Sequence, residues 1–113
     1  MNILFLCTAN LNRSRTAQDF YRSTRTDHQF ESAGLSQKYC QKYGTTLCTV
    51  ELLCWADKIF AMEQAHAQRI AEHVGELYLC KVEVLNIEDV YSYMQRELIE
   101  KLTSHERLQF LSS

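Results

Sequence analysis

The feature that most constrains the fold is an apolar run near the start of the chain that passes directly into a polar segment. Residues 3–6 are all apolar, and residues 7–14 read Cys-Thr-Ala-Asn-Leu-Asn-Arg-Ser. A continuous apolar run of this length is typical of a strand that is buried on both faces of a parallel sheet. Apolar side chains then recur at helical spacing over residues 17–21, which predicts a helix beginning around Arg13. The sequence therefore predicts a strand, a loop and a helix in immediate succession.

The rest of the chain continues this alternation. Further strands are predicted at residues 28–33, 58–62 and 81–85. Further helices are predicted around residues 50–54, 67–74 and 94–102. Alternating strands and helices indicate an α/β fold, a doubly wound parallel sheet of four strands with helices on both faces, of the Rossmann or flavodoxin type. Because the chain has 113 residues and no linker-like segment, we expect residues 1–113 to form one domain.

Composition excludes several classes of protein. The formal net charge is −2, which argues against a surface that neutralises a nucleic-acid backbone. The five cysteines form an odd set with no Cys-x-x-Cys pair, which favours reduced thiols over a disulfide framework or a zinc site. The apolar run at residues 3–6 lacks the features of a signal peptide or a membrane span. We therefore expect a cytoplasmic chain that has no membrane or nucleic-acid partner, no metal and no cofactor.

The loop at residues 7–14 has the residue types that phosphate chemistry requires. A strand that turns tightly into a helix directs backbone N–H groups and the positive end of the helix toward an anion. That field favours the thiolate of Cys7, which can attack phosphorus. The planar guanidinium of Arg13 can bind two phosphoryl oxygens, Ser14 can donate its hydroxyl to the sulfur, and Asn10 suits a left-handed turn. We expect the phosphate to contact Thr8, Ala9, Asn10, Leu11, Asn12 and Ser14.

A second site residue is predicted after the last strand. Expulsion of an aryl oxide or an alkoxide benefits from a proton donor on a loop that faces the nucleophile. Asp89 follows the strand at residues 81–85 and should lie at the same edge of the sheet as Cys7, with Glu88 as the alternative. Asp89 is equally suited to be the N-cap of a helix that begins near Tyr91.

Together these residues resemble the low-molecular-weight protein tyrosine phosphatases, whose hallmark is Cys-x5-Arg-Ser directly after the first strand. Three further segments match in order: Ser-Ala-Gly at residues 32–34, Asp-Lys-Ile-Phe-Ala-Met-Glu at residues 57–63, and Asp89 with Tyr91 where the family has Asp-Pro-Tyr. The chain is similar to a short, divergent member of this family.

The resemblance implies a metal-free, cysteine-dependent hydrolysis of phosphotyrosine in two steps. Cys7 forms a phosphocysteine, Arg13 holds the phosphoryl oxygens, and Asp89 first protonates the leaving group and then activates water. Asn10 and Ser14, together with Ser32, resemble the hydrogen-bond network that fixes the loop in the family. Tyr91 is expected to line the mouth of the cleft and to stack on an aromatic substrate ring. The implied partners are phosphotyrosine proteins or small aryl phosphates.

The chain also departs from the family pattern. Asn12 occupies the position of a second cysteine that protects the nucleophile from oxidation in most members, and Val90 replaces the proline after the acid. The chain is shorter between residues 34 and 57, where the family builds one wall of its cleft, and Lys38 or Tyr39 stands near the position of an aromatic wall residue. We expect a shallower and less selective cleft.

Two other functions fit the same loop. A thiol-linked arsenate reductase would need two further redox thiols. Cys48 and Cys54 are the first candidates, with Cys40 and Cys80 as further options, although the apolar neighbours of Cys48 and Cys54 predict buried packing cysteines. A non-catalytic module would keep the loop as a receptor for phosphate or another oxyanion.

The four histidines are expected on the surface and away from the loop, at positions 28, 66, 73 and 105.

Overall fold

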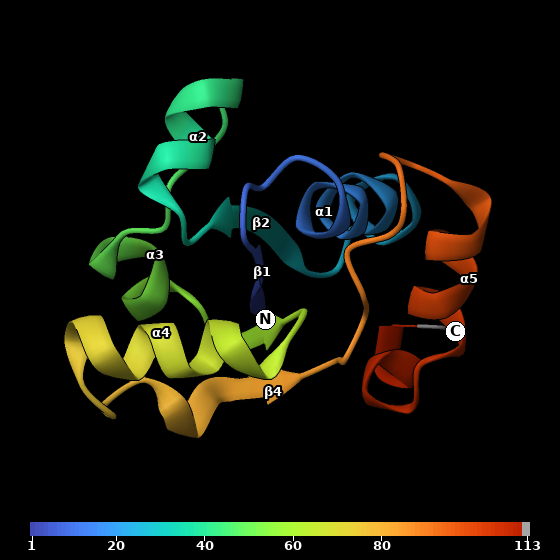
Figure 1. Cartoon of the computed structure of the whole chain (residues 1–113). Coiled ribbons are helices and arrows are strands. Elements are labelled where there is room, and N and C mark those ends of the chain that lie inside the picture. Colours follow the sequence, from blue (N-terminus) through green and yellow to red (C-terminus); the bar gives the residue numbers. More distant parts are fainter. Residues whose placement is uncertain (112–113) are drawn as a thin grey trace.

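The computed structural model describes residues 1–111 and contains one four-stranded sheet. The strands lie parallel in the order β2-β1-β3-β4 (Figure 1). Their bounds are Asn2–Cys7 for β1, Gln29–Gly34 for β2, Lys58–Ala61 for β3 and Val82–Val84 for β4. The predicted doubly wound parallel sheet is confirmed, with β4 at an edge as the alternating pattern of residues 81–85 indicated.

Helices cover both faces of this sheet. The α-helices are α1 (Arg13–Thr24), α2 (Gln37–Tyr43), α3 (Val50–Trp55), α4 (Gln64–Val74) and α5 (Arg96–Ser104). Two short 3₁₀ helices are η1 (Leu79–Lys81) and η2 (Glu106–Leu111). Figure 1 shows α1 and α5 on one side of the sheet, α3 and α4 on the other, and α2 extending away from these layers.

The side chains of β1 alternate between two apolar cores, which explains why its sequence is apolar without a break. Ile3, Phe5 and Cys7 point into the core beneath α1, α5 and η2. Leu4 and Leu6 point into the core beneath α3 and α4. All five side chains are at most 3% exposed. The nucleophile candidate is therefore the last residue of the most deeply buried strand.

The sequence did not predict α2. This helix has seven residues, of which only Cys40 is buried, so it has no apolar periodicity to detect. Its ends are set by capping instead, because the Ser36 side chain accepts a hydrogen bond from the Tyr39 backbone N–H and Gly44 adopts the left-handed conformation with φ of 65°. The helix α5 also begins later than expected, at Arg96, which leaves residues 85–95 as an irregular connection.

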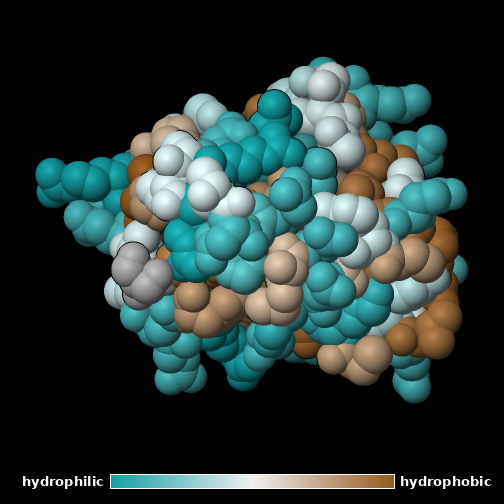
Figure 2. Space-filling model, turned by 180° about the vertical axis from the view of Figure 1, so that it is seen from behind, coloured by the Kyte–Doolittle hydropathy of each residue, from teal (hydrophilic) through white to brown (hydrophobic). Residues whose placement is uncertain are grey.

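Within residues 1–111, no helix is long and apolar enough to cross a membrane. Figure 2 shows that hydrophilic side chains cover most of the face seen from behind, with apolar side chains gathered toward one edge.

Candidate active site

The loop between β1 and α1 lies directly against the end of β2. The backbone N–H of Leu35 lies 3.0 Å from the carbonyl oxygens of both Cys7 and Thr8, and that of Ser36 donates to Thr8 at 3.0 Å. Gly34 makes this approach feasible, since a Cβ atom there would lie 2.7 Å from the Thr8 carbonyl oxygen and 2.6 Å from Cys40 Sγ. The position of the loop is therefore fixed by backbone contacts with Leu35 and Ser36, directly after β2.

A buried network of polar side chains holds the interior of the loop. Asn10 has a φ of 54°, and its Nδ2 donates to Ser14 Oγ at 2.8 Å and to Ser32 Oγ at 2.9 Å. Ser32 donates in turn to Gln18 Oε1 at 2.8 Å. Because Ser14 Oγ accepts from Asn10, its own proton is free to donate to Cys7 Sγ, which lies 2.9 Å away. The structure thus brings together the side chains that the sequence predicted, and adds Gln18.

The backbone of the loop is left with free donors. Within residues 1–111, none of the N–H groups of residues 9–12 donates a hydrogen bond to another protein group. These groups precede the N-terminus of α1, where the helix adds a positive partial charge. The free donors are suited to an oxyanion, and binding of phosphate by the loop stays a prediction.

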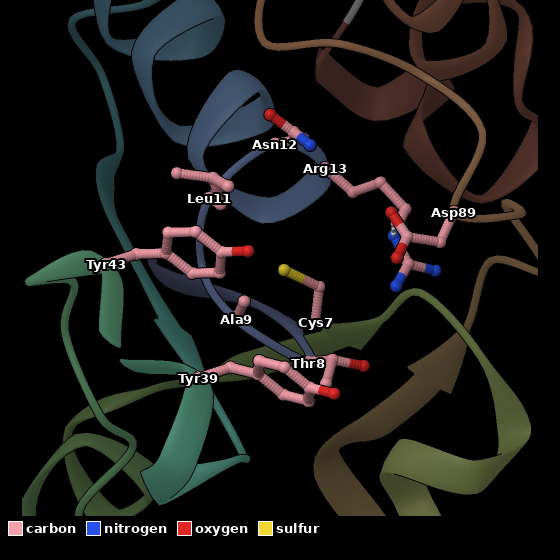
Figure 3. A pocket seen from close by; sticks show the side chains of 9 residues that line it. All are labelled: Cys7, Thr8, Ala9, Leu11, Asn12, Arg13, Tyr39, Tyr43 and Asp89. Atoms are coloured by element: carbon pink, nitrogen blue, oxygen red, sulfur yellow. Dashed lines mark ion pairs between the residues drawn. The ribbon is translucent and has the colours of Figure 1, made fainter. Parts of the chain in front are cut away.

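The Arg13 side chain is 2% exposed and lies between two carboxylates. Its Nη1 donates to Glu63 Oε2 at 2.6 Å and to the Ile87 carbonyl oxygen at 2.8 Å. Its buried Nε makes no hydrogen bond, and lies 3.6 Å from Asp89 Oδ1. Figure 3 shows the Arg13 side chain extending toward Asp89 across the mouth of the loop. The two residues predicted to hold the phosphoryl group and to move the proton are therefore neighbours.

Sequence reasoning missed the role of Glu63. This residue follows β3, which pairs directly with β1, so its side chain emerges at the same sheet edge as the loop. The hydrogen bond from Arg13 lowers the pKa of the Glu63 carboxyl group from its usual value of 4.5, and the Arg13 charge adds to this effect. A carboxylate directly after the strand next to β1 was the signal that would have indicated this contact.

The expectation that His66 lies on the surface and away from the loop is wrong. The His66 side chain is buried, and its Nε2 lies 3.0 Å from Thr8 Oγ1. Its Nδ1 accepts a hydrogen bond from the Glu63 backbone N–H at 3.1 Å. Burial, together with the nearby Arg13 charge, lowers the pKa of His66 to about 4. His66 reaches the loop at residues 7–14 because it lies in the first turn of α4, which begins shortly after β3.

A pocket of about 300 Å³ opens above Cys7 (Figure 3). Its lining residues are Cys7, Thr8, Ala9, Leu11, Asn12, Arg13, Tyr39, Tyr43 and Asp89. Tyr39 and Tyr43 lie one helical turn apart on α2 and form the aromatic wall, whereas Lys38 is absent from the lining. Tyr91, which the resemblance placed at the mouth of the cleft, does not line this pocket and packs against the apolar core instead.

The two candidate redox thiols, Cys48 and Cys54, do not line the pocket above Cys7. Burial raises the pKa of the half-buried Cys48 to about 11. Cys54 is exposed, with its Sγ 3.1 Å from the Tyr78 hydroxyl, so its prediction as a buried packing residue is wrong. Asp89 is not a helix N-cap, because α5 begins at Arg96 and Gln95 occupies its N-cap position. Within the described part of the chain, no group of three His, Cys, Asp or Glu side chains is arranged to hold a metal ion.

Comparison with known proteins identifies the architecture. No family model matches the sequence, and no curated protein matches it. Solved structures do match over most of the chain. A low-molecular-weight protein tyrosine phosphatase from Streptococcus pyogenes, SP-PTP, is 16% identical with a TM-score of 0.66, and the match covers 97% of this chain and 85% of that one. The chain has the fold of the low-molecular-weight phosphatases.

Two other structures with the low-molecular-weight phosphatase fold are informative. A low-molecular-weight protein tyrosine phosphatase from Bacillus subtilis is 26% identical with a TM-score of 0.63, over 75% of this chain and 70% of that one. A mutant of the YwlE arginine phosphatase with a phosphorylated active-site serine is 24% identical with a TM-score of 0.67, over 96% and 99% of the two chains. The resemblance seen in residues 7–14 is thus confirmed at the level of the whole fold.

Proposed function

We propose that this chain is a cysteine-dependent phosphatase that hydrolyses phosphotyrosine or small aryl phosphates through a phosphocysteine intermediate. The observation that carries the proposal is the arrangement around Cys7. Its Sγ lies 2.9 Å from Ser14 Oγ at the centre of a loop with free backbone N–H groups, and the pocket above it is lined by Arg13 and Asp89. This arrangement supports Cys7 as the nucleophile, the loop as the anion site and Asp89 as the proton donor around one cavity.

In the first step, the Cys7 thiolate attacks phosphorus. A bond forms between sulfur and phosphorus while the bond between phosphorus and the aryl oxygen breaks. The protonated carboxyl group of Asp89 gives its proton to the departing oxygen. The loop N–H groups and the Arg13 guanidinium stabilise the charge on the three remaining phosphoryl oxygens. The buried Nε of Arg13, which has no hydrogen-bond partner in this structure, is a donor that a phosphoryl oxygen would satisfy.

In the second step, water hydrolyses the intermediate. The Asp89 carboxylate takes a proton from water as the water oxygen attacks phosphorus, and the bond between sulfur and phosphorus breaks. Inorganic phosphate leaves, and the Cys7 thiolate is restored with the hydrogen bond from Ser14 stabilising it as the leaving group. The step consumes one water molecule and needs no redox partner.

The walls of the pocket favour an aryl leaving group. Tyr39 and Tyr43 present two rings on one side of the pocket, and Leu11 adds an apolar side chain to the same lining. Rings of this kind stack on a planar aromatic group and offer little to a small alkyl phosphate. Structural relatives include both tyrosine and arginine phosphatases. For this chain the aromatic lining supports the aryl substrate.

The test is hydrolysis of para-nitrophenyl phosphate by the parent chain in the presence of a chelator. We expect turnover that Cys7→Ser abolishes. We expect Asp89→Asn to lower kcat by about 100-fold, a typical contribution of a general acid. The loss should be larger for phenyl phosphate than for para-nitrophenyl phosphate, because the poorer leaving group depends more on protonation.

Substrate choice is tested with the same preparation. We expect phosphotyrosine and aryl phosphates to have a higher kcat/KM than phosphoserine and phosphoarginine, and Tyr43→Ala to raise KM for the aryl substrates only. Reduced, folded protein that binds inorganic phosphate but turns over none of these substrates would contradict the proposal and indicate an oxyanion-binding module. Thiol-dependent turnover of arsenate without phosphatase activity would indicate a reductase.

A further inference from the structure

The two ring nitrogens of His66 have different partners, and this fixes the direction of one hydrogen-bond chain. Nδ1 faces the Glu63 backbone N–H at 3.1 Å, and a backbone N–H can only donate. Nδ1 is therefore the acceptor, and the neutral ring carries its proton on Nε2. Burial keeps this ring neutral, with a pKa of about 4. The chain thus runs from the Glu63 backbone through His66 to Thr8.

The proton on His66 Nε2 determines which hydrogen bonds the Thr8 hydroxyl can make. Nε2 lies 3.0 Å from Thr8 Oγ1 and donates its proton to it, so Oγ1 uses a lone pair on this contact. The hydroxyl proton of Thr8 then remains for another acceptor, and within residues 1–111 no protein group accepts it. Thr8 lines the pocket above Cys7, where the loop N–H groups and Arg13 favour an anion.

We propose that His66 is a positioning residue that holds the Thr8 hydroxyl as a hydrogen-bond donor to the phosphoryl group bound over Cys7. Thr8 would then contribute its side chain as well as its backbone to the phosphate site. The inference rests on the proposed phosphatase function and extends it, because it assigns a polar side chain on α4 to the recognition of the substrate.

Charge favours an anion in the pocket above Cys7 over the other cavity that Thr8 borders. A second pocket of about 320 Å³ is lined by His66, Arg69 and two carboxylates, Glu63 and Glu72, whose negative charge disfavours an anionic ligand there. Within residues 1–111 neither carboxylate accepts the Thr8 hydroxyl proton, and Glu63 accepts from Arg13 instead. In the pocket above Cys7, an anionic ligand is the strongest acceptor available to a hydroxyl group, and hydrogen bonds to charged acceptors are about twice as strong as neutral ones.

Two matched pairs of variants separate the hydroxyl contact from general packing. Thr8→Val removes the hydroxyl while keeping the branched shape, and Thr8→Ser keeps the hydroxyl. His66→Asn keeps an acceptor for the Glu63 N–H but has no group that reaches Thr8, whereas His66→Gln places an amide donor near the position of Nε2. All four are measured in the full chain, together with the double variant Thr8→Val/His66→Asn.

Binding of inorganic phosphate, measured by calorimetry, is the primary readout, and kcat/KM for para-nitrophenyl phosphate is the second. We expect Thr8→Val and His66→Asn each to weaken phosphate binding about tenfold, as for loss of one hydrogen bond to a charged group. The double variant should be no weaker than either single variant, because both remove the same contact. Thr8→Ser and His66→Gln should keep near-parental affinity.

Additive losses in the double variant, or unchanged phosphate binding by Thr8→Val, would overturn the inference. Folding is checked by the thermal transition of each variant, and Thr8→Val serves as the decisive variant if His66→Asn does not fold. These outcomes are distinct from failure of the proposed function, in which the parent chain itself lacks turnover. Phosphate binding by calorimetry reports on Thr8 in either case.

Discussion

Arg13 is the residue on which the site depends most directly, since its buried guanidinium contacts one carboxylate and lies close to a second. The sequence predicted Cys7, Arg13 and Asn10 correctly as neighbours, because all three lie within one seven-residue loop whose local geometry follows from a strand passing into a helix. Glu63 and His66 are brought to the loop by the pairing of β3 with β1. Contacts of that kind depend on strand order, which a single sequence does not state.

Glu63 should make the stability of the fold depend on pH. Its pKa in the folded state is lowered from 4.5 by the hydrogen bond from Arg13. A carboxylate with a lowered folded-state pKa stabilises the fold above its unfolded-state pKa, and this contribution is lost as the pH falls through the folded-state value. We expect Glu63→Gln to lower the free energy of unfolding by about 1 kcal/mol at pH 7, a modest amount because the carboxylate is partly exposed.

The measurement is urea denaturation of parent and variant between pH 3 and pH 7. The difference between them should shrink as the pH falls below about 4.5, the unshifted value for this group. Glu76→Gln is the matched control, because Glu76 is exposed and forms no ion pair among residues 1–111. A difference for Glu63→Gln that stays constant across this range would show that the ion pair with Arg13 contributes nothing to stability.

At the scale of elements, the decisive contact is between the end of β2 and the loop. Ser32 and Gly34 were identified from their match to the family, and the strand that carries them was predicted within one residue. Their structural roles depend on the fold, in which Ser32 accepts a hydrogen bond from Asn10 and Gly34 lies against the backbone of the loop. The helix α2, which builds the aromatic wall of the pocket, was not predicted because capping rather than burial defines it.

A methyl group at position 34 should displace the loop. The added Cβ would lie 2.7 Å from the Thr8 carbonyl oxygen and 2.9 Å from the Ala9 carbonyl carbon, distances that force the backbone to shift. We expect Gly34→Ala to lower the free energy of unfolding by about 1–3 kcal/mol, as for overpacking. It should also lower kcat/KM for para-nitrophenyl phosphate at least tenfold, because the free N–H groups move with the loop.

The matched control is Gly75→Ala at the end of α4. Gly75 has a φ of 78°, so alanine is strained there as well, but no atom lies within 4 Å of the added Cβ. We expect a loss of stability of about 1 kcal/mol from the backbone conformation alone and an unchanged kcat/KM. Equal effects of the two variants on activity would mean that the loop does not depend on Gly34.

At the scale of the whole molecule, one sheet separates two apolar cores, and the larger core extends to the end of the described chain. Leu108 lies in η2 and is completely buried against the same core as Phe5. No pattern in the sequence predicted this segment, because a short 3₁₀ helix lacks the periodicity by which longer helices are recognised.

Removing the Leu108 side chain should therefore weaken the entire fold. We expect Leu108→Ala to lower the free energy of unfolding by about 2–5 kcal/mol, the usual cost of a large cavity in a core. Leu77→Ala is the control, since Leu77 is 74% exposed and its truncation should change stability by less than about 0.5 kcal/mol. Equal changes for the two variants in a denaturant titration would exclude η2 from the cooperative core.

The proposed nucleophile, Cys7, and the proposed acid, Asp89 in the connection at residues 85–95, differ in how firmly the fold holds their side chains. Cys7 ends a strand whose neighbours hold it on both sides, so its place is settled once, when the chain folds. Asp89 belongs to an irregular segment and its side chain is 64% exposed. The backbone beside Asp89 is held, because Ile87 is buried in the core and its carbonyl oxygen accepts a hydrogen bond from Arg13. The exposed side chain itself can change rotamer within picoseconds to nanoseconds. Cys7 thus keeps its place for as long as the molecule stays folded, and we expect the Asp89 side chain to be brought into place anew in every cycle of the proposed reaction.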